Sequence, residues 1–211
     1  MKLIVYTIPY DIKDEVKTIN RLFEDGLDNL HVRKPGFSAS TIKEMIKGID
    51  PQFHQNLVLH SHYHLALTHD IKGIHLSNPN FFIKQQYAKL LKLKKNDLQV
   101  ASTVHDIHQT TDINSVVDYA MVGPLYTKYS EENKKTNFNR FELAQSVQNA
   151  SKKLIALGGI SIQDIPLLQQ IGFAGVALQS AIWKSTDANQ AFNAFKMSIA
   201  KEGEFNRSMA I

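Results

Sequence analysis

The sequence predicts an α/β protein that folds as a single (β/α)8 TIM barrel, and three observations favour this fold. Short apolar runs alternate eight times with amphipathic or polar segments, and the connections between them are short. Regular alternation of this kind is typical of a parallel sheet with right-handed crossovers. The chain of 211 residues is close to the lower limit for eight complete units. An open doubly wound sheet rarely has eight units, and no Gly-x-Gly-x-x-Gly motif follows the first strand.

The predicted strands are short apolar runs, several of which stop at small or polar residues. This pattern is expected of buried parallel strands. In chain order the strands are residues 2–7, 30–33, 56–60, 73–76, 98–104, 118–123, 154–160 and 175–180.

The predicted helices lie between these strands. The first, residues 14–27, has helically spaced apolar side chains at Val16, Ile19 and Leu22, and Ser38 is a suitable N-cap for the second, residues 38–49. The other helical segments are a short piece at 64–67, an amphipathic helix at 81–95, a weak helix from 106, and helices at 141–152, 161–171 and 189–199. No break interrupts the series, so we assign residues 1–202 to one barrel domain and 203–211 to a C-terminal tail.

The composition is that of an ordinary globular domain and limits the classes of partner. A formal net charge of +4 and a pI near 9.1 favour anionic ligands. The lysines are scattered rather than grouped in a basic block, so we expect no nucleic-acid partner. The lack of cysteine excludes disulfides and thiolate chemistry. Because no apolar run reaches membrane-spanning length and no leader is recognisable, we expect a cytoplasmic protein without a membrane partner.

Two glycine-containing or small-residue turns follow the last two predicted strands. Gly158-Gly159 ends one strand, and Gln179-Ser180 ends the next. In a β/α barrel the loops after the last two strands are the usual phosphate site, because main-chain N–H groups there can approach an anion closely. The alternative is that the glycines only make a tight strand-to-helix turn.

The predicted strand ends should meet at one mouth of the barrel, because parallel strands point the same way. Arg33 is the most informative of the residues there, since a guanidinium can bind phosphate oxygens through two hydrogen bonds. The alternative for Arg33 is an ion pair with a carboxylate at the rim. The strand-end residues as a set are Thr7, Arg33, His60, His75, Thr103, His105, Gly123, Gly159 and Ser180.

The histidines allow several interpretations. His60, His62 and His64 alternate, as three zinc ligands on one strand face would. The strand is predicted to end near His60, however, and no carboxylate stands at ligand spacing, so we predict no metal site there. His105 directly follows a strand and could be an acid or base, or a buried structural residue. The polar segment 126–139, which includes Ser130, is either a lid that offers donors to an anion or a solvated surface loop.

Six short motifs follow one another along the chain. They are Leu30-His31-Val32-Arg33, Gly73-Ile74-His75-Leu76, Thr103-Val104-His105, Asp118-Tyr119 with Gly123-Pro124-Leu125-Tyr126, Ile155-Ala156-Leu157-Gly158-Gly159-Ile160 and Gly175-Val176-Ala177-Leu178-Gln179-Ser180. In this order and spacing they resemble the thiamine phosphate synthase / TenI family of small (β/α)8 barrels, nearly from end to end. The resemblance implies a role in thiamine biosynthesis.

Synthases of this family join hydroxymethylpyrimidine diphosphate to thiazole phosphate and release pyrophosphate. The resemblance therefore implies small-molecule thiazole and pyrimidine phosphates as partners. It places Gly159, Gln179 and Ser180 on the thiazole phosphate. Arg33 in the second strand and Ser130 in the segment after the sixth fall where the family binds phosphate, and we add Thr103 as a further substrate-binding candidate.

The resemblance also implies Mg²⁺ in the reaction, but the sequence departs from the family at the metal positions. The two carboxylates that bind the ion align with Ser61 and Asn80. Mg²⁺ prefers charged oxygen ligands, so we expect no certain cofactor and a weakened activation of the pyrimidine diphosphate.

Two further functions stay open on the same resemblance. TenI-branch enzymes tautomerise thiazole phosphate, but their catalytic histidine aligns with Pro124, which cannot transfer a proton. A tautomerase would then use His60 or His105 as its acid or base. The third possibility is a non-catalytic barrel that binds thiazole or thiamine phosphate. The barrels of this family are often dimers, so the resemblance also makes a homodimer an expectation.

Overall fold

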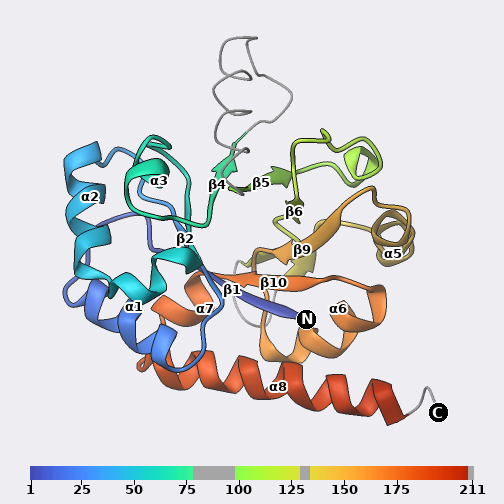
Figure 1. Cartoon of the computed structure of the whole chain (residues 1–211). Coiled ribbons are helices and arrows are strands. Elements are labelled where there is room, and N and C mark those ends of the chain that lie inside the picture. Colours follow the sequence, from blue (N-terminus) through green and yellow to red (C-terminus); the bar gives the residue numbers. More distant parts are fainter. Residues whose placement is uncertain (78–97, 129–133, 209–211) are drawn as a thin grey trace.

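The computed structural model describes the backbone of residues 1–77, 98–128 and 134–208. Within these ranges, eight parallel strands close into a barrel with the order β1-β10-β9-β6-β5-β4-β3-β2, and helices surround it (Figure 1). The predicted TIM-barrel fold is therefore correct. The barrel strands are β1 Lys2–Tyr6, β2 Asn29–Val32, β3 Leu57–Leu59, β4 Gly73–Leu76, β5 Gln99–Val104, β6 Tyr119–Val122, β9 Lys153–Leu157 and β10 Gly175–Leu178.

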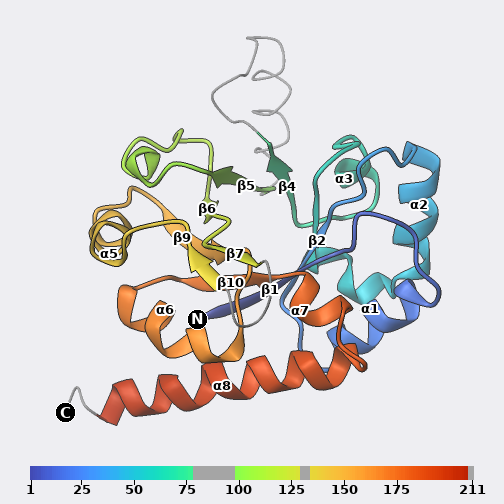
Figure 2. The ribbon, with the colours of Figure 1, turned by 180° about the vertical axis from the view of Figure 1, so that it is seen from behind.

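The helices cover the outer face of the barrel, as both views show (Figures 1 and 2). The α-helices are α1 Glu15–Glu24, α2 Ala39–Gly48, α3 Leu65–Thr68, α5 Arg140–Gln148, α6 Ile165–Ile171, α7 Ser180–Trp183 and α8 Ala188–Ser208. Short 3₁₀ turns are η1 Pro51–Asn56, η3 Ile107–Gln109 and η4 Ile162–Asp164. No helix in the described ranges combines the length and the apolar character needed to cross a bilayer.

Ser38 caps α2 as predicted, because its side chain accepts a hydrogen bond from the main-chain N–H of Thr41. The weak helix predicted from residue 106 is only the 3₁₀ turn η3. The helix predicted at 81–95 lies outside the described residues. The last helix was predicted to end at Ile199, but α8 runs on to Ser208 through Gly203 and so includes most of the segment predicted as a tail. A glycine within a helix costs only about 1 kcal/mol, so it does not have to end one.

The polar segment 126–139 contains more regular structure than the sequence predicts. Residues Tyr126–Lys128 form β7 and Lys134–Thr136 form β8, which pair as an antiparallel hairpin. The main-chain N–H of Asn137 donates to the carbonyl of Leu125, and the Asn137 side chain donates to the carbonyl of Pro124. The base of this hairpin is therefore fixed to the end of β6.

Strand residues alternate between two packing layers. The odd positions of β1, Leu3 and Val5, pack in the large core between barrel and helices. Its even positions, Ile4 and Tyr6, pack inside the barrel, where the apolar cluster also contains Met121, Ile155 and Ala177. This alternation decides which side chains reach the barrel axis.

A buried ion pair fixes the segment that follows β2. The Lys34 ammonium contacts the Glu15 carboxylate at the start of α1, and the two side chains are 1% and 5% exposed. Lys34 also donates a hydrogen bond of 2.6 Å to the carbonyl of Tyr10. Burial raises the pKa of the Glu15 carboxyl above its ordinary value, while the bond and charge of Lys34 lower it. The pair holds the residue next to Arg33 against the barrel wall.

We expect Lys34→Met to lower the free energy of unfolding by about 3 kcal/mol, because it leaves a buried carboxylate without its partner. Urea unfolding followed by circular dichroism measures this loss. Lys47→Met is the matched control, since Lys47 pairs with Glu44 on the exposed surface of α2 and should leave the urea midpoint unchanged. Equal midpoints for the two variants would show that the buried pair does not anchor this segment.

Candidate functional site

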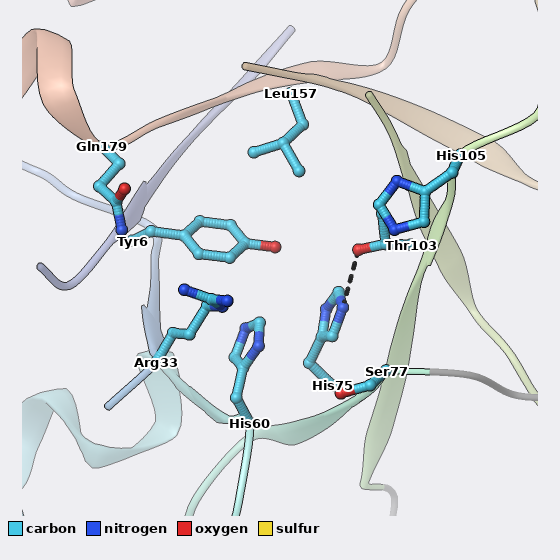
Figure 3. Close-up of a pocket in the computed structure, with 9 residues that line it drawn as sticks. All are labelled: Tyr6, Arg33, His60, His75, Ser77, Thr103, His105, Leu157 and Gln179. Carbon is cyan, nitrogen blue, oxygen red and sulfur yellow. Dashed lines mark hydrogen bonds between the residues drawn. The ribbon is translucent and has the colours of Figure 1, made fainter. Parts of the chain in front are cut away.

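The carboxyl ends of the strands open into a cavity of about 290 Å³. Its lining combines rings, hydroxyls, an amide and one guanidinium, and these side chains come from both halves of the chain (Figure 3). A space of this size suits a small ligand. The described residues that line it are Tyr6, Arg33, His60, His75, Ser77, Thr103, His105, Leu157 and Gln179.

Arg33 lies at the rim of this cavity with its guanidinium directed inward (Figure 3). Its main chain is fixed by Thr7, whose hydroxyl accepts a 2.8 Å hydrogen bond from the Arg33 N–H and donates one of 3.1 Å to the Arg33 carbonyl. Among the described residues, no carboxylate lies within ion-pair distance of the guanidinium. The guanidinium therefore keeps its five donors available to an anion in the cavity.

The turn after β9 requires both of its glycines. Gly158 has a φ of 93° and Gly159 a φ of 67°, a region that favours glycine. A Cβ on Gly159 would lie 2.7 Å from the carbonyl oxygen of Tyr126, and one on Gly158 would lie 2.6 Å from the Cβ of Pro124. The backbone therefore supports the interpretation that Gly158 and Gly159 are needed for a tight turn. Contact between the main chain of Gly159 and a phosphate stays a prediction.

Gln179 joins the last strand to the first. Its side-chain amide donates a 2.8 Å hydrogen bond to the carbonyl of Thr7, and the rest of the side chain lines the cavity. Ser180 is exposed and begins α7, directly after Gln179. In the described part of the chain, no hydrogen bond is found for the main-chain N–H of Gly159 or of Ser180. Neither residue lines the cavity: Gly159 stands two residues after the lining residue Leu157, and Ser180 directly follows the lining residue Gln179.

His105 is exposed at the cavity and has one fixed ring nitrogen. Its Nδ1 lies 2.8 Å from the carbonyl oxygen of Gly123. A carbonyl only accepts, so in the neutral ring Nδ1 carries the proton and Nε2 keeps its lone pair. The geometry suits a proton acceptor and does not support the alternative of a buried structural histidine.

Three histidines, His31, His60 and His75, converge in the barrel interior, and two of them, His60 and His75, also line the cavity. His31 Nδ1 lies 3.0 Å from His60 Nε2, and His31 Nε2 lies 2.9 Å from the Tyr119 hydroxyl. His75 Nε2 lies 3.0 Å from the Thr103 hydroxyl (Figure 3). The rings of His60 and His75 stack, with centroids 4.1 Å apart and planes inclined by 6°.

Burial keeps these imidazoles uncharged. It lowers the pKa of His31 well below its ordinary value, with a smaller contribution from His75. It also lowers the pKa of His60, with further contributions from His75, His31 and Arg33. Burial, and then the charge of Arg33, lowers the pKa of His75 to about 3. Near neutral pH the interior therefore presents lone pairs and N–H donors rather than cations.

The described lining fits Mg²⁺ poorly. None of the nine described residues around the cavity is a carboxylate, and Ser61 is not among them. Asn80 and Ser130 lie outside the described residues, so the structure says nothing of them. Asp106 and Asp112 line an adjoining cavity of about 160 Å³, but they come from the segment after β5. The charged oxygens that Mg²⁺ prefers are therefore absent from the described wall of the mouth.

The structure brings together five of the predicted site residues, Arg33, His60, Thr103, His105 and Gln179, and leaves Gly159 and Ser180 beside them. The alternating set His60, His62 and His64 does not converge, because His62 Nε2 turns to the carbonyl of Phe37 at 2.8 Å.

Sequence reasoning missed Tyr6 and His31 and left the role of His75 open. The feature of the sequence that could have identified these residues is the alternation of side chains between the two faces of a strand. His31 stands two residues before Arg33 and therefore shares its face of β2.

Comparison with known sequences identifies one family. A family model described as "Thiamine monophosphate synthase" matches residues 3–182. A thiamine-phosphate synthase of Photorhabdus laumondii is 25% identical over 187 residues, which cover 86% of this chain and 85% of the relative. Another from Klebsiella pneumoniae is 22% identical over 183 residues, with coverages of 84% and 85%.

Solved structures agree with the sequence comparison. The thiamine phosphate pyrophosphorylase of Bacteroides thetaiotaomicron superposes with a TM-score of 0.74 at 26% identity, covering 97% of this chain and 98% of that one. The pyrophosphorylase of Pyrococcus furiosus gives a TM-score of 0.75 at 18% identity, which shows the fold alone.

Proposed function

This chain belongs to the thiamine monophosphate synthase family, and from that premise we propose that it is a transferase of thiamine biosynthesis. It binds thiazole phosphate at the barrel mouth and couples it to hydroxymethylpyrimidine diphosphate, and pyrophosphate is released. The observation that carries the proposal is the Arg33 guanidinium, which faces the mouth cavity with no carboxylate partner among the described residues.

We place the phosphate between Arg33 and two main-chain turns. The main-chain N–H groups of Gly159 and Ser180 follow strands β9 and β10, which are neighbours in the barrel. Both are free of intramolecular hydrogen bonds among the described residues. A phosphate held by these amides and by Arg33 would exchange water for fixed, preorganised donors.

The chemistry makes modest demands on the protein. The bond between the pyrimidine methylene carbon and the diphosphate oxygen breaks, and the pyrimidine ring stabilises the carbocation. The thiazole nitrogen then attacks that carbon, so no covalent link to the protein is needed. The uncharged ring pair His60 and His75 offers a flat wall for an aromatic ring. The Arg33 guanidinium has five N–H donors and can contact more than one phosphate group, so besides holding the thiazole phosphate it stabilises negative charge on the departing pyrophosphate.

Divalent metal would add further charge stabilisation to the departing pyrophosphate in this family. The described wall offers it no carboxylate, so we derive no step through Mg²⁺. On this proposal Arg33 carries more of the charge stabilisation than it would beside a bound ion.

We expect Arg33→Gln to weaken thiazole phosphate binding at least about tenfold, because a charged hydrogen-bond donor is worth about 1.5–3 kcal/mol. Calorimetric titration measures the affinity, and chromatographic detection of thiamine phosphate measures coupling, which should fall by a similar factor or more. Arg21→Gln on the exposed face of α1 is the control and should change neither. Unchanged affinity in Arg33→Gln would contradict the proposed phosphate position, and absence of product from the wild-type chain would contradict the transferase.

A second candidate function is tautomerisation of thiazole phosphate, and the fixed tautomer of His105 favours it. The ring nitrogen Nε2 keeps its lone pair, and His105 lines the cavity. A base placed in this way can remove a proton from a bound carbon acid.

If His105 is that base, His105→Asn should abolish exchange of the thiazole carbon-bound proton with solvent deuterium, while thiazole phosphate still binds. Proton NMR follows the exchange directly. His108→Asn is the control, because His108 is exposed in η3 and does not line the cavity. Exchange that continues at the wild-type rate in His105→Asn would exclude this residue as the base.

A further inference from the structure

We infer that His31, His60 and His75 form a binding site for one transition-metal ion of the zinc class. One ligand atom from each residue can be chosen so that all three lie within 4.8 Å of one another. The site goes beyond the proposed function and does not depend on it, because the cluster is defined by its own geometry. It also replaces the alternating set His60, His62 and His64, which does not converge.

The barrel register explains why these three residues meet. They come from neighbouring strands β2, β3 and β4, or from the residue directly after the strand. The pairs Val32↔Leu59 and Leu59↔Ile74 place His60 beside His75 when the register is continued by one residue. All three rings then point to the same part of the barrel interior, a rigid arrangement of the kind that metal sites need.

In two of the histidines, the ring nitrogen that would face away from the ion already has a hydrogen-bond partner. Tyr119 holds His31 Nε2 at 2.9 Å, and Thr103 holds His75 Nε2 at 3.0 Å. Metal-binding histidines commonly have such a partner on the nitrogen that does not face the ion, since it fixes the ring and its tautomer. In both rings this leaves Nδ1 as the nitrogen that can face an ion.

The ring nitrogens that would face the ion make few hydrogen bonds. His75 Nδ1 is buried and has no hydrogen-bond partner, which is unfavourable for a polar atom in a residue only 2% exposed. His31 Nδ1 and His60 Nε2 lie 3.0 Å apart and share a single hydrogen bond. Tetrahedral zinc with bonds of about 2.0–2.1 Å separates two nitrogens by about 3.3 Å, so this pair has to widen slightly, whereas ligand atoms that now lie up to 4.8 Å apart have to approach. The stacked rings of His60 and His75 must also tilt for their lone pairs to converge.

The donor set decides the class of metal. Neutral imidazoles without a carboxylate suit Zn²⁺, Co²⁺, Ni²⁺ or Cu²⁺ and do not suit Mg²⁺ or Ca²⁺. Three protein ligands leave a fourth position, and His60 and His75 both line the mouth cavity. The nearby Arg33 charge disfavours a bare dication and favours an anion, such as a phosphate oxygen, at this fourth position.

Titration of the tag-free, full-length protein with Co²⁺ tests the inference without any thiamine precursor present. We expect one ion per chain, with the visible d–d absorption of a nitrogen-rich cobalt site. His60→Gln should weaken binding at least about tenfold by removing one ligand. His75→Gln is the second variant, used if His60→Gln does not fold as judged by circular dichroism. His108→Gln is the exposed control and should bind like the wild type.

X-ray absorption of the Zn²⁺-loaded wild-type protein gives a readout that needs no variant. The expected result is a shell of light ligands with the scattering pattern of three imidazoles. A shell of oxygens alone, no uptake of one ion per chain, or uptake unchanged in whichever of the two histidine variants folds would overturn the site. The two proposals share His60 and His75 but have separate readouts, since cobalt uptake is measured without thiamine precursors and coupling is measured without added transition metal. Failure of either measurement therefore leaves the other proposal standing.

Discussion

The pairing of β1 with β10 closes the barrel, and the position of the mouth residues depends on this seam. The register runs from Lys2↔Gly175 to Val5↔Leu178. Beyond the strands, the Gln179 side chain bonds the carbonyl of Thr7, and the indole N–H of Trp183 donates to the carbonyl of Tyr6 at 2.6 Å. The Thr7 hydroxyl in turn forms hydrogen bonds with both the main-chain N–H and the carbonyl of Arg33. Hydrogen bonds thus join the two ends of the chain to the residue proposed to bind phosphate.

The burial of polar side chains is a second constraint on the structure. These side chains lie in the barrel interior at the end near the mouth. His31 is fully buried, and its two ring nitrogens are both hydrogen-bonded. His75 Nδ1 and the Tyr6 hydroxyl are buried without a partner among the described residues. Polar atoms in this condition destabilise the fold, and such groups gather at functional sites more often than elsewhere. The apolar layer below, with Ile4, Met121 and Ile155, offsets that loss by burial.

Much of this arrangement could be predicted from the sequence. The alternation of apolar runs and amphipathic segments predicts the barrel, and the strand ends locate Arg33, Thr103 and His105 at one mouth. These inferences need only local patterns and the rule that parallel strands end on one side. The same rule selects Ser180 at the end of the last strand, whereas its neighbour Gln179, which lines the cavity, is indicated by the family resemblance.

Other features depend on tertiary register and could not be predicted. Which histidines converge is set by the stagger between β2, β3 and β4. The sequence shows only the alternation of His60, His62 and His64, from which no metal site is predicted. The hairpin β7–β8 forms through pairing between residues that have no strong alternation, and Asn137 then fixes its base. The helix α8 packs against α1, α6 and α7, and it continues past Gly203, a residue that gives only a weak stop signal.

The central claim is that a phosphoester binds between the Arg33 guanidinium and the main-chain turns after β9 and β10. A crystal structure of the protein with thiazole phosphate tests it most directly. The account predicts phosphate oxygens within hydrogen-bond distance of the guanidinium and of the N–H groups of Gly159 and Ser180. A phosphate bound elsewhere, with Arg33 directed into bulk solvent and those N–H groups covered by neighbouring side chains, would contradict it.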